Sequence, residues 1–235
     1  MPNLTPIALS AMHHRQVDLD AVMVERDGWQ RPARYGRIED EVERVRSSVG
    51  LHDVSPVGKL ILHGEGITSL LQALAPDVGT LEIGRAARHQ LKGGSGATDV
   101  VLARLAADET LVLTGPGQAP VVAGILALSP GDCAHAVDVT SALAGLKVTG
   151  PLSHRLLASV TELDISPSEF PNMTCAQAKV AEIHGTVVRR DLGALTSYDL
   201  YVGREYGEYM WDALVEAGEE DNVSPFGIEA MARLQ

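Results

Sequence analysis

The segment whose spacing most directly suggests chemistry is the glycine-rich run Gly93-Gly94-Ser95-Gly96. Such runs can cradle phosphate through their backbone N–H groups when Lys-Ser or Lys-Thr and then a helix follow. Neither follows here, because Asp99 and the apolar segment 100–105 come next and predict a strand. The run therefore predicts a tight turn, and Asp99 taken alone is typical of a residue that caps one.

Histidine, cysteine and arginine are the other residue types with reactive or binding side chains. The eight histidines are His13, His14, His52, His63, His89, His135, His154 and His184. None has the His-x-x-x-His spacing that places two ligands on one helix face, so no metal site is predicted. The two cysteines, Cys133 and Cys175, have no metal-ligand spacing and are expected to be free thiols. Arg88 and His89 are adjacent and could bind an anion or form a surface pair after a strand.

The charge balance limits the classes of partner. The chain of 235 residues has a formal net charge of −12, which argues against a nucleic-acid backbone as partner. An anionic small molecule would require a local basic patch. No apolar stretch approaches the roughly 20 residues of a membrane span, and no secretion signal is visible, so a soluble cytoplasmic protein is expected.

An internal repeat organises the chain. The run Leu-Ile-Leu-His-Gly ends at Gly64, and Leu-Lys-Val-Thr-Gly ends at Gly150 (150 − 64 = 86). Each run precedes a segment with apolar residues on one helical face, 67–74 and 152–160. Two further strands end at Gly115 in the first copy, over 100–105 and 110–114, and at Gly203 in the second, over 187–190 and 198–202. Helical segments are then expected over 119–128 and 205–217, the latter with Tyr206, Tyr209, Met210, Ala213 and Leu214 as its apolar stripe.

This order predicts an α+β fold of two tandem split-βαβ-like modules that share one domain. The expected divisions are an N-terminal segment over 1–56, module one over 57–130, module two over 137–218 and a closing segment over 219–235. The charged stretch 34–48 carries apolar residues at helical spacing, so it predicts an amphipathic helix with a solvated face.

A family resemblance rests on several short motifs in a fixed order. They are Asp27-Gly28-Trp29, Pro32 and Tyr35, the stretch 41–46, Gly50-Leu51-His52-Asp53-Val54-Ser55, Gly58, Gly64, Gly84-Arg85-Ala86, Asp99, Gly150-Pro151, and 201–230 with Trp211 and Gly227-Ile228-Glu229-Ala230. In this order and spacing the sequence resembles the folate-binding domain of the aminomethyltransferase (glycine-cleavage T-protein) family. The resemblance runs from about residue 12 to residue 235.

The resemblance implies a ring of modules around a central hole that holds tetrahydrofolate, here without the family's C-terminal β-barrel domain. It also implies that Asp99 is the catalytic carboxylate, which stabilises a cationic carbon passed between nitrogens and relays a proton. The positions that recognise the pterin ring in the family carry other residues in this chain. Leu195 stands in place of a glutamate, Gly115 in place of an asparagine and Arg88 in place of a tyrosine. With His89 and Tyr198 they are the candidate cofactor-binding residues.

Three functions are compatible with this resemblance. The first is a tetrahydrofolate-linked aminomethyl or methyl transferase or demethylase. The second follows from a resemblance of residues 138–218 to the gamma subunit of heterotetrameric sarcosine oxidase, and implies a non-catalytic subunit that docks onto a flavin-dependent oxidase or dehydrogenase. The third is a member repurposed for another small ligand, with Arg88, His89 and Leu195 lining the hole.

Overall fold

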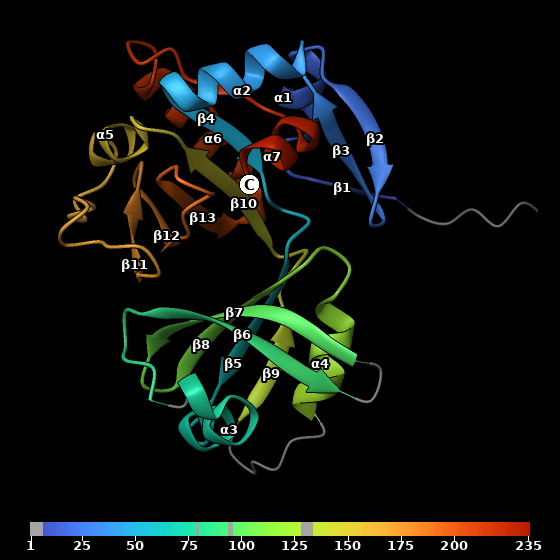
Figure 1. Cartoon of the computed structure of the whole chain (residues 1–235), viewed down its shortest axis with the longest axis vertical. Helices are drawn as coiled ribbons and strands as arrows, with labels where there is room; N and C mark the ends of the chain where they lie inside the picture. The colour runs from blue at the N-terminus through green and yellow to red at the C-terminus, as the bar shows by residue number, and fades with distance from the viewer. Residues whose placement is uncertain (1–6, 79, 94–95, 128–133) are drawn as a thin grey trace, which may run out of the picture.

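The computed structural model describes residues 7–78, 80–93, 96–127 and 134–235. Two sheets are stacked along the long axis of the molecule, and each has its own helices (Figure 1). Cys133 and part of the glycine-rich run, Gly94-Ser95, lie outside the described residues. No helix within the described ranges is both long and apolar enough to cross a bilayer.

The first sheet has five antiparallel strands in the order β6-β7-β8-β5-β9. In chain order they are β5 (Gly58–His63), β6 (Ala86–Gly93), β7 (Gly96–Ala106), β8 (Glu109–Thr114) and β9 (His135–Asp138). Two helices, α3 (Ile67–Leu74) and α4 (Ala119–Ala127), pack on one face, and a short 3-10 turn, η1 (Pro76–Val78), follows α3. Their core contains Leu60, Leu70, Leu102 and Val122, because alternate strand residues and one helical stripe meet there.

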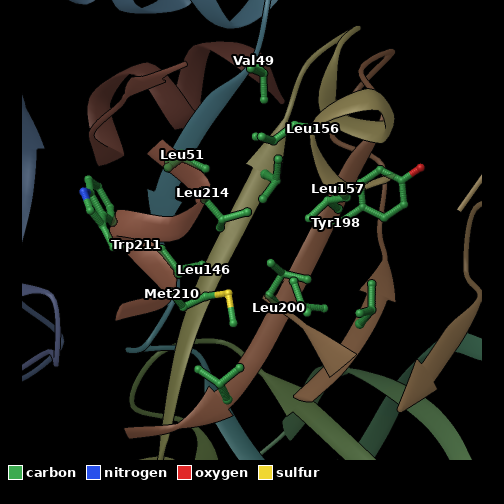
Figure 2. Close-up of a cluster of buried hydrophobic side chains, with 14 of the residues drawn as sticks. Val49, Leu51, Leu146, Leu156, Leu157, Tyr198, Leu200, Met210, Trp211 and Leu214 are labelled. Atoms are coloured by element: carbon green, nitrogen blue, oxygen red, sulfur yellow. The ribbon is translucent and has the colours of Figure 1, made fainter. Parts of the chain in front are cut away.

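The second sheet has six strands in the order β11-β12-β13-β10-β4-β14. They are β4 (Gly50–Asp53), β10 (Leu143–Thr149), β11 (Cys175–Val180), β12 (Ile183–Arg189), β13 (Ser197–Gly203) and β14 (Ser224–Pro225). Its helices are α5 (Ser153–Ala158) and α6 (Gly207–Ala217), with the turn η2 (Arg204–Tyr206) before α6. Figure 2 shows the core between them, where Leu146 and Leu200 from the sheet contact Leu156, Met210 and Leu214 from the helices.

The predicted repeat is confirmed in the sheets. The order β6-β7-β8-β5 in the first corresponds to β11-β12-β13-β10 in the second. Gly64 and Gly150, which end the corresponding strands, have nearly the same positive φ, 134° and 132°. The predicted mixed α and β fold class is therefore correct. The structure adds that β4, from the predicted N-terminal segment, joins the second sheet, and that β9 joins the first.

One pair of corresponding positions differs in chemistry between the two sheets. In the first sheet Ile61 on β5 is opposite Leu111 on β8. In the second, Lys147 on β10 is opposite Asp199 on β13. Both pairs lie on the sheet face away from the helices. Leu146 and Leu200, the neighbours of Lys147 and Asp199, point into one helical core, and Leu60 and Val112, the neighbours of Ile61 and Leu111, point into the other.

The N-terminal residues form a small third sheet in the order β1-β3-β2. Its strands are β1 (Ala8–Leu9), β2 (Val22–Arg26) and β3 (Trp29–Arg34), and the remaining helices are α1 (His13–Asp18), α2 (Ile38–Ser47) and α7 (Ile228–Leu234). The amphipathic helix expected over 34–48 is α2, but Glu41 departs from its solvated face. The Glu41 carboxylate is buried and accepts backbone N–H bonds from Tyr35, Gly36 and Gly227, so it joins α2 to the start of α7.

The apolar stripe predicted for the helix over 205–217 is wrong in its first two members. Tyr206 and Tyr209 are 41% and 50% exposed, whereas Met210, Trp211 and Leu214 are buried. The α-helix begins at Gly207, where a Cβ would lie 2.5 Å from the Cβ of Ala11. Trp211 joins Met210 and Leu214 in the buried core instead of the two tyrosines (Figure 2).

Candidate functional site

A cavity of about 1080 Å³ lies between the two sheets. Its lining comes from β6, β7 and β8 of the first sheet, from β4, β10 and the residue after β12 of the second, and from β2, β3 and α7. Among the described residues, the acidic side chains that line it are Asp27 and Asp99, and the basic ones are Arg26, Arg31, Arg88, Lys92, Lys147 and Arg190. On a chain with a net charge of −12 this is a local excess of positive charge. A groove of about 600 Å³ between α2 and α7 holds none of the predicted site residues.

The first sheet contributes Asp99 and Arg88 to the cavity. Asp99 on β7 pairs in register with Gln90 on β6, and Arg88 pairs with Val101, so all four side chains share one face. The Gln90 amide Nε2 donates to Asp99 Oδ1 at 2.8 Å, which orients the carboxylate. Asp99 is exposed toward the cavity, where a ligand atom can reach it.

His89 and Gly115 also border this cavity, with different geometry. Strand alternation places the His89 side chain on the opposite face from Arg88, in register with Val100 of the helix-covered core. Gly115 follows the last residue of β8, and a Cβ there would meet the Gln118 side chain at 3.6 Å, an ordinary contact. The structure thus brings Asp99, Arg88, His89 and Gly115 to one cavity.

The second sheet contributes what we call the buried charge cluster, made of Lys147, Asp199 and Arg190. Lys147 Nζ lies 2.5 Å from Asp199 Oδ1 and 3.2 Å from Ser197 Oγ. Arg190 Nη2 lies 2.7 Å from Asp199 Oδ2. Asp199 is fully buried, yet the two cations lower its pKa below its usual range despite the opposing effect of burial. The carboxylate is therefore ionised between two cations, and the cluster keeps one net positive charge.

The lysine of this cluster lies among further positive charges. Burial lowers the pKa of Lys147, and the nearby guanidinium groups of Arg190 and Arg88 lower it further, against Asp199. Burial and then the Asp199 carboxylate raise the pKa of Tyr201 well above its ordinary value, so its phenol keeps the proton. Lys147 and Arg190 both line the cavity.

His52 on β4 is a neutral member of the same wall. Its Nδ1 lies 2.8 Å from the Phe226 carbonyl oxygen, and its ring stacks on the Phe226 ring with centroids 5.0 Å apart. Because a carbonyl oxygen can only accept, Nδ1 carries the hydrogen. Burial lowers the pKa of His52 to about 4, and the Arg31 and Lys147 cations add to that shift.

Leu195 and Tyr198 do not line this cavity. A tight turn, in which Leu192 and Leu195 exchange backbone hydrogen bonds of 2.9 Å, packs Leu195 against the apolar cluster of α2 and α7. Tyr198 is fully buried on the helical side of β13, where its hydroxyl donates to the Ile165 carbonyl oxygen at 3.1 Å. Its neighbour in sequence, Asp199, is the residue that faces the cavity side of the sheet.

The described cysteine and histidines show no sign of a metal centre. Cys175 is a free, buried thiol, and burial raises its pKa to about 12, so it is not a reactive thiolate. Among the described residues no three histidine, cysteine, aspartate or glutamate side chains gather as metal ligands would.

Sequence reasoning missed Lys147, Asp199, Arg190 and His52 as site residues. A signal was present, because Lys147 lies between Leu146 and Val148, and Asp199 between Tyr198 and Leu200, in otherwise apolar strands. A charge at one alternate position of such a strand indicates a polar surface on that face. The partner strand, however, could not be identified from the sequence.

The GCVT N-terminal domain model matches residues 12–235. The aminomethyltransferase of Streptomyces coelicolor is 31% identical over 232 residues, which are 97% of this chain and 61% of that protein. The chain therefore spans about three fifths of the length of the aminomethyltransferases that it matches.

Two solved structures share the fold. Aminomethyltransferase T of the glycine cleavage system from Bartonella henselae superposes with a TM-score of 0.84 at 18% identity, over 97% of this chain and 62% of that one. A chain of the heterotetrameric sarcosine oxidase of Corynebacterium sp. U-96 superposes with a TM-score of 0.59 at 19% identity, over 90% of this chain and 94% of that one.

Proposed function

The chain belongs to the GCVT N-terminal domain family, and from that premise we propose that its cavity binds tetrahydrofolate for transfer of a one-carbon group, with Asp99 as the catalytic carboxylate. The observation that carries the proposal is the position of Asp99. Its carboxylate is exposed on the wall of a cavity of about 1080 Å³, beside Arg88 and near Gly115. That volume suits a ligand of this size, since small-molecule sites typically measure about 300–1000 Å³.

The residues present fit such a ligand through their charges. Asp99 and Asp27 offer acceptors to ring N–H groups, and the basic side chains offer partners to the carboxylates of a glutamate tail. Leu195 supplies neither a hydrogen-bond acceptor nor a charge, and its side chain packs against α2 and α7. Recognition of the pterin ring would therefore depend on the residues of β6, β7 and β8.

The role proposed for Asp99 is electrostatic and acid–base. When bound, tetrahydrofolate would supply the nitrogens between which the one-carbon unit is held. The Asp99 carboxylate, oriented by Gln90 at 2.8 Å, stabilises positive charge that develops on the carbon and can accept or return a proton.

Isothermal titration calorimetry with tetrahydrofolate and the purified chain tests binding. We expect a binding heat that reaches saturation as the ligand is added. The Asp99→Asn variant keeps the shape of the side chain, so its affinity should change little. Its rate of one-carbon transfer should fall by about 10²–10⁴-fold. No heat up to millimolar tetrahydrofolate, or a variant as active as the wild type, would contradict the proposal.

A second candidate function is that of a subunit in a flavin-dependent oxidase or dehydrogenase complex. Two observations favour it. The superposed sarcosine oxidase chain is matched over 94% of its length, and exposed apolar side chains gather in the N-terminal segment, at Ile7, Leu9, Val17, Leu19, Val22 and Val24. Several such residues close together favour a contact surface. Purification from the native host should then yield a larger complex, and a chain that always elutes alone would argue against this function.

A further inference from the structure

The buried charge cluster is not needed to build the fold. At the corresponding place in the first sheet, Ile61 is opposite Leu111, and that pair is apolar. The same strand order therefore forms with or without an ion pair at this position. A buried ion pair is often no more stabilising than well-packed apolar residues. Lys147 and Asp199 thus require an explanation other than stability.

The charges of the cluster do not cancel within the protein. Lys147 and Arg190 share the one carboxylate of Asp199. Arg88 acts on Lys147 as a further cation, and the charges that act on His52 are the cations Arg31 and Lys147 with the single carboxylate of Asp53. Like charges held together at low solvent exposure raise the free energy of the unliganded state. An anion in the cavity would relieve this repulsion.

We propose that Lys147 and Arg190, held in place by Asp199 and assisted by Arg88, form a binding site for the carboxylate of a small organic acid. The Lys147 ammonium forms an ion pair with Asp199 and donates one hydrogen bond to Ser197 Oγ, so a further ammonium hydrogen is available to a ligand. The planar guanidinium of Arg190 pairs with Asp199 through Nη2 and has further donors for a carboxylate. This inference rests on the proposed function only in taking the same cavity as the ligand site.

The class of anion follows from the charge of the cluster. The buried part of the site, made of Lys147, Arg190 and Asp199, has a single net positive charge, which suits a monoanion, and Arg88 adds a second charge that solvent screens at the exposed end. A phosphate group carries a charge of about −1.5 to −2 at pH 7, which exceeds this charge more than a carboxylate does. A carboxylate can come from a small organic acid bound by itself or from the glutamate end of a folate, and both sources use the same chemistry.

Thermal denaturation of the purified chain with sodium acetate, glycine or inorganic phosphate tests the site, at an ionic strength held constant with sodium chloride. Acetate and glycine should raise the melting temperature more than phosphate does. The Lys147→Met and Arg88→Gln variants should each weaken carboxylate affinity by about tenfold or more, since each removes a charge-assisted hydrogen bond. The Arg44→Gln variant, on the exposed side of α2, is the matched control and should bind like the wild type.

Three results would overturn the site: no carboxylate effect beyond that of chloride, a larger effect of phosphate, or wild-type affinity in both cavity variants. Arg88 is exposed on a strand of the first sheet, so its variant should fold and still tests the site if Lys147→Met does not fold. Tetrahydrofolate binding without any carboxylate effect defeats this inference but not the proposed function, and the reverse result defeats only the proposed function. If acetate competes with tetrahydrofolate, the glutamate end of the folate is the carboxylate. Independent binding identifies a separate organic acid.

Discussion

The two sheets have the same strand order but contribute to the cavity in opposite ways. The first sheet presents Asp99 and Arg88 as solvent-accessible side chains on β7 and its neighbour β6, at one end of the sheet, and the pair on β5 and β8, Ile61 and Leu111, is apolar. The second sheet presents Lys147 and Asp199 at the corresponding central pair, buried and in contact. One repeat therefore carries these polar groups as exposed side chains and the other as buried ones.

This difference separates two kinds of polar residue. Exposed charges on a strand cost little to place, because water solvates them in the folded and unfolded states alike. Buried charges must be paired, and removal of one partner leaves the other uncompensated. We therefore expect changes in the second sheet to alter stability strongly, and changes on the first to alter ligand interactions alone.

The largest effect is expected from Asp199→Leu, which places the apolar residue of the first sheet into the second. The substitution leaves Lys147 and Arg190 without their carboxylate, and the expected cost is about 3–5 kcal/mol of unfolding free energy. The double variant Lys147→Ile with Asp199→Leu reproduces the pair at 61 and 111, and should recover much of this loss. Urea denaturation measures both. A double variant no more stable than Asp199→Leu would show that the two sheets are not interchangeable at this pair.

A smaller effect is expected from the pH dependence of His52. Its pKa is about 4 in the folded protein, against about 6.5 when unfolded, so the unfolded state binds more protons between these values. Stability present above pH 6.5 is then lost as the pH falls to 4, by on the order of 3 kcal/mol. The His52→Phe variant keeps an aromatic ring against Phe226 and should lack this part of the acid loss.

Urea denaturation at several pH values between 7 and about 4 provides the measurement for His52. His184→Gln, at an exposed position, is the control, and its stability difference from the wild type should stay nearly constant with pH. Parallel curves for the wild type and His52→Phe would show that burial of this imidazole does not drive the acid loss.

Much of the fold could be predicted because its signals are local. Alternation along a strand and helical spacing of apolar residues each depend on a few neighbouring residues, and the paired glycines Gly64 and Gly150 mark the repeat. The exchange of β4 and β9 between the sheets could not be predicted, since each pairs with a strand that the local pattern does not identify. The close approach of Gly207 to Ala11 at the start of α6 likewise joins segments far apart in the sequence.

The candidate site likewise contains residues that local motifs identify and residues that only long-range packing brings together. Asp99, Arg88 and Gly115 were found through a motif order, and the structure brings them to one cavity. Leu195 aligns with a recognition position, but its direction is set by a tight turn and by the α2 and α7 cluster, which distant segments build. The buried charge cluster was missed because Lys147 and Asp199 are far apart in the sequence (199 − 147 = 52). The two side chains come into contact only because β10 pairs with β13.

The smallest effect is expected from Asp99→Asn, and it tests the contrast between exposed and buried carboxylates most directly. Asp99 is exposed and its amide replacement can still accept the hydrogen bond from Gln90, so the unfolding free energy should change by no more than about 0.5 kcal/mol. The same chemical change in the second sheet, Asp199→Asn, removes the charge between Lys147 and Arg190 and should cost several times more. Urea denaturation of the two variants side by side measures the difference. Equal costs would mean that Asp99 is held by the fold as firmly as Asp199, and its assignment as a ligand-facing carboxylate would lose its physical basis.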